Sequence, residues 1–149
     1  MIYHGNCNTL DGLDNDVAAI VAVLQKHYDR YDSIAVQGLS GITVGLLAAR
    51  ELGKPLVIVR KENDGSHAGS RLVNDEYMGE RVLFLDDFIS SGATRSRVEE
   101  SVVDHCYHRT FDGENTNRSY SRLVGTLEYC HIEGASEYDP GDDGLKWRE

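Results

Sequence analysis

This sequence has few basic side chains and no long apolar runs. Its 15 Lys and Arg residues face 25 Asp and Glu residues, and the net charge of −10 argues against nucleic acid as the main partner, because phosphate backbones require clustered cations. No apolar run reaches membrane-spanning length, and the amino terminus lacks the pattern of a signal peptide. The three cysteines lack metal-binding spacing, so we expect reduced thiols. These absences predict a soluble, cytoplasmic protein that binds neither nucleic acid nor a membrane.

The sequence also lacks internal repeats, low-complexity tracts and an interdomain linker. Its 149 residues, 40% of them apolar and 27% charged, have the composition of an ordinary globular protein that can bury a core without disulfides. We therefore expect a single domain over residues 1–149.

The most informative stretch runs from Arg81 to Thr94. Four consecutive apolar residues, Val82 to Leu85, fit a strand buried on both faces, as in parallel sheets. Asp86 and Asp87 follow it at the carboxyl end, where open α/β sheets bind their ligands. A loop of small residues comes next, before a predicted helix from Arg95 to His105: Ser90, Ser91, Gly92, Ala93 and Thr94.

This order of elements predicts a site for a phosphorylated sugar. Small residues let the loop N–H groups and the helix N-terminus surround a phosphate. The acids would bind hydroxyl groups, either directly or through a divalent cation, which prefers oxygen ligands. Two alternatives are a response-regulator receiver domain, whose acid pair belongs near the start of the chain, and a buried strand followed by a solvated acidic turn.

A second strand and loop precede this stretch. Ser33 to Gln37 is a short apolar strand that ends in Gly38-Leu39-Ser40-Gly41, and an apolar helix from Ile42 to Leu52 stops at Gly53. Such a loop offers backbone donors to an anion at a helix start, although a simple turn fits it equally well.

A third strand, Leu56 to Val59, ends in the adjacent cations Arg60 and Lys61. The following residues, 62–79, are polar and rich in Gly, Ser and Asn, with a lone His67. A stretch of this length without periodicity is usually functional, so we expect a lid. Solvated charges and an exposed histidine are the simpler alternatives.

The remaining elements complete an α/β pattern. Asp14 or Asn15 is a candidate cap for a helix from Asp16 to Tyr28, after an irregular lead-in over residues 1–12. A strand is expected from Arg122 to Ile132, and the acidic tail holds the single tryptophan, Trp147. The fold class predicted is a doubly wound, mostly parallel sheet flanked by helices.

The Arg81–Thr94 stretch resembles the phosphoribosyl pyrophosphate (PRPP) signature of the type I phosphoribosyltransferases. The resemblance covers a core of about residues 33–132 and implies that Asp86 and Asp87 lie by the ribose hydroxyls while Ser90 to Thr94 hold the 5′-phosphate. It further implies that Leu39, Ser40 and Gly41 contact pyrophosphate. The family covers the base with a hood built from the chain termini, which are short here.

The run Arg60-Lys61-Glu62 resembles the lid lead-in of orotate phosphoribosyltransferases, in which a lysine and a histidine close over PRPP. His67 matches that histidine by type and approximate position, whereas Asn63 and Asp64 stand where the family has its lysine. Arg71 is a possible replacement at a different spacing. This resemblance implies that Arg60, Lys61 and His67 are catalytic.

The expected activity is therefore PRPP-dependent transfer of ribose 5-phosphate to a nucleobase, with release of pyrophosphate. Orotate is narrowly preferred as the acceptor base. The family implies Mg²⁺, held mainly by PRPP and through water by Asp86 and Asp87, and a homodimer. Trp147 is a tentative contact for the base, with packing of the tail as the alternative. A regulator that binds PRPP or a nucleotide without turnover is the alternative function.

Overall fold

The computed structural model describes residues 10–61, 72–87, 92–111, 121–129, 132 and 144–148. They form a six-stranded sheet in the order β3-β2-β1-β4-β5-β6. The inner strands β2, β1, β4 and β5 are parallel, and the short edge strands β3 and β6 are antiparallel to their neighbours. This sheet confirms the predicted mostly parallel α/β fold. The strands are β1 (Ser33–Val36), β2 (Leu56–Val59), β3 (Leu72–Val73), β4 (Arg81–Asp86), β5 (Arg122–Glu128) and β6 (Leu145–Trp147).

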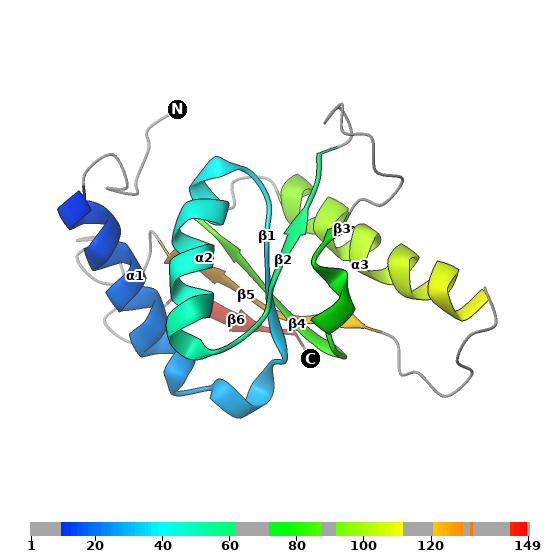
Figure 1. Cartoon of the computed structure of the whole chain (residues 1–149), viewed down its shortest axis with the longest axis horizontal. Helices are drawn as coiled ribbons and strands as arrows, with labels where there is room; N and C mark the ends of the chain where they lie inside the picture. The colour runs from blue at the N-terminus through cyan, green and yellow to red at the C-terminus, as the bar shows by residue number, and fades with distance from the viewer. Residues whose placement is uncertain are drawn as a thin grey trace.

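In the described part of the chain, three α-helices cover the two faces of the sheet (Figure 1). Helices α1 (Leu10–Gln25) and α2 (Leu39–Leu52) pack on one face, and α3 (Ala93–Phe111) packs on the other. Because successive side chains of a strand point to opposite faces of the sheet, each buried strand contributes apolar residues to both cores. In β4, for example, Leu83 and Leu85 join the core under α1 and α2, whereas Val82 and Phe84 join the core under α3. A strand buried on both faces has to be apolar throughout, as its sequence predicted.

Helix α2 lies very close to the sheet. A Cβ atom at Gly45 would lie 2.6 Å from Cγ1 of Val36, so only glycine allows this approach. The helix ends as predicted at Gly53, which adopts a left-handed conformation with φ of 68°.

The amino-terminal edge of the parallel strands is held by polar contacts. Oδ2 of Asp32 accepts hydrogen bonds from the backbone N–H groups of Glu80 and Arg81, at 3.2 Å and 2.9 Å. Oδ1 of Asp32 pairs with the Arg81 guanidinium at 2.8 Å. The Ser33 hydroxyl donates to the Met78 carbonyl at 2.7 Å. These contacts join the starts of β1 and β4 at the edge opposite Asp86.

Several sequence-based boundaries were wrong. Helix α1 already begins at Leu10, so Asp14 and Asn15 lie inside it and do not cap it. Part of the predicted lid, Leu72–Val73, is strand β3, which pairs with β2, and a 3-10 turn follows at Asp75–Tyr77. The tail contributes β6, which pairs with β5. Both edge strands are too short to show periodicity, and pairing with a neighbouring strand is what forms them.

The other differences concern where elements end. Helix α3 continues to Phe111, beyond the predicted His105, and β5 ends at Glu128 instead of Ile132. A 3-10 turn, Tyr28–Arg30, joins α1 to β1. Among the described residues, no helix is long and apolar enough to cross a membrane.

Candidate functional site

The carboxyl ends of the four parallel strands meet at one edge of the sheet. From β1 the chain passes through α2 to β2 on one side, whereas β4 lies on the other side of β1 and leads through α3 to β5. The strand order therefore reverses between β1 and β4, with α2 on one face and α3 on the other. Open α/β sheets bind their ligands at such a switch point.

Asp86 is the last residue of β4 and lies at this switch point. It is only 7% exposed, and its Oδ1 atom accepts a hydrogen bond from the Asp87 backbone N–H at 2.9 Å. Burial, with smaller contributions from the Asp87 side chain and from Glu128, raises the pKa of Asp86 to about 7. Its charge therefore changes near neutral pH, and a cation or a hydroxyl donor placed there would favour the carboxylate.

Glu128 is a neighbour of Asp86 that the sequence analysis missed. The parallel register of β4 and β5 pairs the two residues directly, and the negative charge of Glu128 contributes to the raised pKa of Asp86. The alternating pattern of residues 122–132 placed Glu128 on a strand but gave no register. Only the pairing of β5 with β4 brings it to the acid pair.

The loop after β1 forms the second part of the edge. Gly38 adopts φ of 83°, a conformation that favours glycine, and its carbonyl accepts a hydrogen bond from the Ile42 N–H at 3.0 Å. Helix α2 starts at Leu39, so Ser40 and Gly41 belong to its first turn. The sequence had suggested that they form a separate loop before a helix starting at Ile42. Their backbone N–H groups are at a helix start, where an anion is favoured.

The cations after β2 lie next to this loop. A Cβ atom at Gly38 would be 3.9 Å from both Cε and Nζ of Lys61, so the lysine side chain reaches the β1 loop. The Gln37 side-chain amide donates to the Arg60 carbonyl at 3.4 Å and links the ends of β1 and β2. A cavity of about 380 Å³ opens here, lined by the loop, the aliphatic side chains of α2 and β2, and both cations.

The predicted phosphate loop is described from Gly92 onwards. Gly92 has φ of 78°, and its carbonyl accepts a hydrogen bond from the Ser96 N–H at 3.0 Å. Helix α3 begins at Ala93, so Ala93 and Thr94 offer backbone donors at its first turn. Ser90 and Ser91 lie outside the described residues, as does His67.

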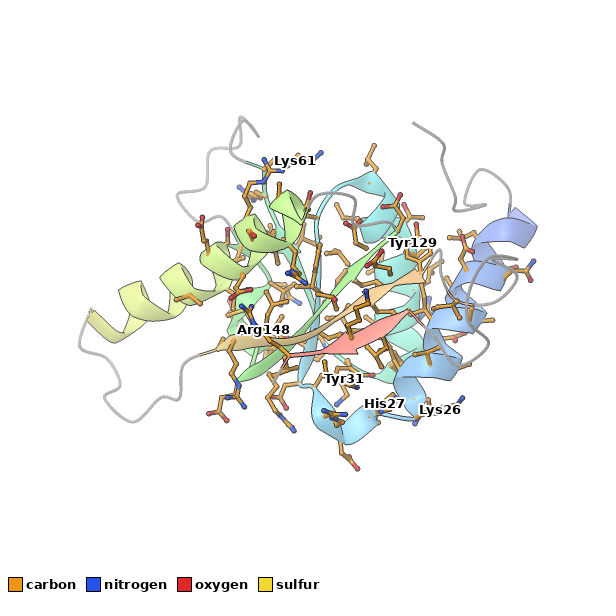
Figure 2. The ribbon with its side chains drawn as sticks, turned by 180° about the vertical axis from the view of Figure 1, so that it is seen from behind. Lys26, His27, Tyr31, Lys61, Tyr129 and Arg148 are labelled. Carbon is orange, nitrogen blue, oxygen red and sulfur yellow. The ribbon has the colours of Figure 1, made fainter. Side chains whose placement is uncertain are left out.

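Trp147 lies at the other end of the sheet. Its indole packs against the Arg30 guanidinium, 3.9 Å from the ring centre, and makes an edge contact with His27. Both of these residues precede β1. Figure 2 shows His27 and Tyr31 at the end of the sheet opposite Lys61 and Tyr129. This position favours the packing role of Trp147 over contact with a base.

The residues at the edge do not form a metal cage on their own. Among the described residues, no group of three or more His, Cys, Asp or Glu side chains is arranged to hold a metal ion. Two carboxyl groups, Asp86 and Asp87, are adjacent in the chain, and they suit a cation that is coordinated mainly by its own ligand and water. The donor set therefore fits Mg²⁺ delivered with a polyphosphate.

Comparisons with known proteins agree with this geometry. Orotate phosphoribosyltransferase from Thermococcus gammatolerans is 30% identical over 90 residues, which cover 60% of this chain and 48% of that protein. Hypoxanthine/guanine phosphoribosyltransferase from Methanosphaerula palustris is 28% identical over 125 residues, covering 70% of this chain and 69% of the relative. No family model matches the chain. The chain spans about half the length of the orotate phosphoribosyltransferase it matches.

A solved structure extends the likeness to the fold. Adenine phosphoribosyltransferase from Leishmania donovani superposes with a TM-score of 0.57 and 16% identity, over 81% of this chain and 53% of that one. In sequence this chain is similar to orotate and hypoxanthine/guanine phosphoribosyltransferases, and in fold it is similar to an adenine phosphoribosyltransferase.

Proposed function

We propose that this chain transfers ribose 5-phosphate from PRPP to a nucleobase, with orotate as the preferred acceptor, and releases pyrophosphate. The observation that carries the proposal is the arrangement at the switch point. Asp86 ends β4, which precedes the helix start suited to phosphate, and β4 pairs with β1, whose glycine loop is reached by Lys61. This order matches the order of groups in PRPP, with a phosphate at one end, a ribose in the middle and a pyrophosphate at the other end.

Each part of the edge would have a distinct role. Residues 90–94, with the N-terminus of α3, would anchor the non-reacting 5′-phosphate, so that remote binding energy positions the reacting carbon. The Asp86 and Asp87 carboxylates would hold the ribose hydroxyls and favour positive charge on the sugar in an oxocarbenium-like transition state. We expect His67 and the lid to exclude water.

The leaving group becomes more negative as the bond to C1 of the ribose breaks. Arg60 and Lys61, with the first-turn N–H groups of Leu39, Ser40 and Gly41, would stabilise that charge. Mg²⁺ bound to PRPP would neutralise part of the pyrophosphate charge, with Asp86 and Asp87 as its water-mediated protein contacts. In a chain with a net charge of −10, such local positive charge is needed to bind a polyanion.

The preference for orotate is supported by the Arg60-Lys61-Glu62 lead-in and by the orotate phosphoribosyltransferases among the relatives. Relatives and structural neighbours named for hypoxanthine, guanine and adenine make the purines the main competitors. We also propose that the protein is a cytoplasmic homodimer. Light scattering tests the oligomeric state.

A second candidate function is a regulator that binds PRPP or a nucleotide without turnover. The specific observation that favours it is the presence of Asn63 and Asp64 where orotate phosphoribosyltransferases have a lid lysine. A lid without this cation would stabilise the leaving pyrophosphate less. The intact Asp86 and Asp87 pair favours the enzyme.

One assay separates these functions. Pyrophosphate release from PRPP and Mg²⁺ is measured with orotate, uracil, adenine, hypoxanthine, guanine, xanthine and nicotinamide, one at a time. We expect release with orotate. Release with another base alone would correct the acceptor and keep the enzyme. If no base gives release while PRPP still raises the melting temperature, the regulator replaces the enzyme.

A further inference from the structure

A second cavity lies between α3 and the edge formed by β5 and β6. Its volume is about 170 Å³, and its described lining includes neither the acid pair nor the Gly38 loop. Pockets that enclose whole drug-sized ligands are typically about 300–1,000 Å³. This cavity therefore suits a small ion or a single chemical group of a larger ligand.

Cations dominate the polar lining of this cavity. Arg95 comes from the first turn of α3, whereas Lys146 and Arg148 come from β6 and the residue after it. Arg148 makes an ion pair with Glu99, the one acid in the described lining. Within the described part of the chain, Arg95 and Lys146 make no ion pair. Two uncompensated cations in a chain of net charge −10 mark this cavity as locally positive.

A buried hydroxyl group forms part of the same lining. Thr126 of β5 is only 6% exposed and lies in register with Lys146 on β6. Its side chain has no hydrogen-bond partner among the residues that the structure describes. A hydroxyl buried without a partner costs free energy, and a ligand oxygen in the cavity would accept a hydrogen bond from it. Thr126 thus points independently to an oxygen-rich ligand.

We propose that this cavity binds a phosphate-class anion, held by Arg95, Lys146 and the Thr126 hydroxyl. Guanidinium and ammonium groups form charge-assisted hydrogen bonds to phosphate oxygens, and the threonine hydroxyl supplies a neutral donor. The Arg148–Glu99 ion pair closes one side of the cavity between β6 and α3; Figure 2 shows Arg148 at the end of β6. The described lining includes neither the acid pair nor the Gly38 loop, although Arg95 directly follows Thr94 of the switch-point loop.

Three kinds of ligand carry a phosphate-class anion, and a titration separates them. Inorganic phosphate, pyrophosphate and uridine monophosphate are each added to ¹⁵N-labelled full-length protein, and backbone amide shifts are followed at Thr126 and Lys146. Saturable shifts at these residues are the expected result. Tighter binding of the nucleotide than of phosphate assigns the cavity to a phosphoryl group of a nucleotide, and equal binding assigns it to the free anion. Shifts at Gly92 and Thr94 report separately on the switch-point loop.

Variants test the three side chains. In Arg95→Gln combined with Lys146→Gln, we expect the dissociation constant at the cavity to rise at least about tenfold. Thr126→Val, which keeps shape and charge, should also weaken binding. The matched control, Arg50→Gln combined with Lys26→Gln, removes the same two charge types from exposed positions, one in α2 and one in the turn after α1, and should leave binding unchanged.

Two results would overturn the site. One is a set of shifts at Thr126 and Lys146 that chloride reproduces at equal ionic strength. The other is binding that survives the Arg95 and Lys146 changes or is weakened equally by the Arg50 and Lys26 control.

Discussion

The two ends of strand β4 use carboxyl groups in opposite ways. Next to its first residue, Arg81, the Asp32 carboxylate accepts hydrogen bonds from the backbone and side chain of Arg81, which hold its pKa below the ordinary value. At its last residue, burial raises the pKa of Asp86 to about 7. The Asp32 carboxylate is compensated by hydrogen bonds and a guanidinium within the protein, whereas the Asp86 carboxyl group is buried with a raised pKa.

The surroundings of the two ends reinforce this contrast. At the Asp32 end, Nζ of Lys54 donates to the carbonyls of Tyr28 and Tyr31, at 2.9 Å and 2.8 Å. At the Asp86 end, Gly38 and Gly92 take left-handed conformations before helix starts, and Leu39 is 85% exposed. The two edges therefore differ in how far the protein itself compensates their polar groups, and a binding role for the carboxyl edge would explain the difference.

The largest expected effect comes from removing both acids at the binding end. Asp86→Asn combined with Asp87→Asn should lower the rate of pyrophosphate release at least about 100-fold, because the ribose and the developing positive charge lose their carboxylates. Circular dichroism should show an intact fold. Full activity in this variant would refute the assignment of the acid pair.

Breaking the structural end should have the opposite outcome. Asp32→Ala removes the acceptor for the Glu80 and Arg81 N–H groups, so we expect a loss of about 2 kcal/mol in the free energy of unfolding, with the specific activity of folded protein retained. Urea denaturation at pH 7 measures the loss. Because the pKa of Asp32 is lowered in the folded state, its contribution should disappear as the pH falls below about 4. An equally stable variant would contradict the role given to Asp32.

A single change at Asp86 should stabilise the protein. The folded protein favours protonated Asp86, so stability from this group is full below about pH 4 and is lost as the pH rises through 7. Asp86→Asn removes that loss and should gain about 1–2 kcal/mol at pH 8, allowing for solvent screening, and nothing at pH 4. Denaturation at both pH values measures it, with Asp14→Asn on the exposed face of α1 as the control. A gain that does not depend on pH would refute the titration of Asp86.

The smallest expected effect is at Lys61. Lys61→Gln should weaken PRPP binding by roughly threefold, because the side chain is exposed and screened although it reaches the Gly38 loop. Calorimetric titration of PRPP with Mg²⁺ measures it, and Lys26→Gln, a change of an exposed lysine in the turn after α1, serves as control. Equal weakening in both variants would mean that overall charge, and not the position of Lys61, sets the affinity.

Much of the binding end could be predicted because it is local in the sequence. The apolar run of β4, the two acids and the small-residue loop are consecutive, and backbone preferences act over a few residues. The cations after β2 and the glycine loop after β1 were found in the same way. His67, Ser90 and Ser91 remain predictions, since they lie outside the described residues.

The features that were missed depend on pairing between distant segments. Neither β3 nor β6 is long enough to form alone, so each exists because an adjacent strand supplies its hydrogen-bond partners. The helix boundary at Leu10 was missed because polar residues in the first turns of α1 look like a cap. Tertiary packing overrides such local preferences.

The sequence by itself determined the order of elements and the chemical character of each strand end, because these follow from apolar runs, charges and glycines close together in the chain. Tertiary structure decided which ends meet. It brought Glu128 beside Asp86 and Lys61 beside Gly38, and it placed Trp147 against Arg30 at the other end of the sheet. It also set the pKa of Asp86, because burial and neighbouring charges exist only once distant strands have paired.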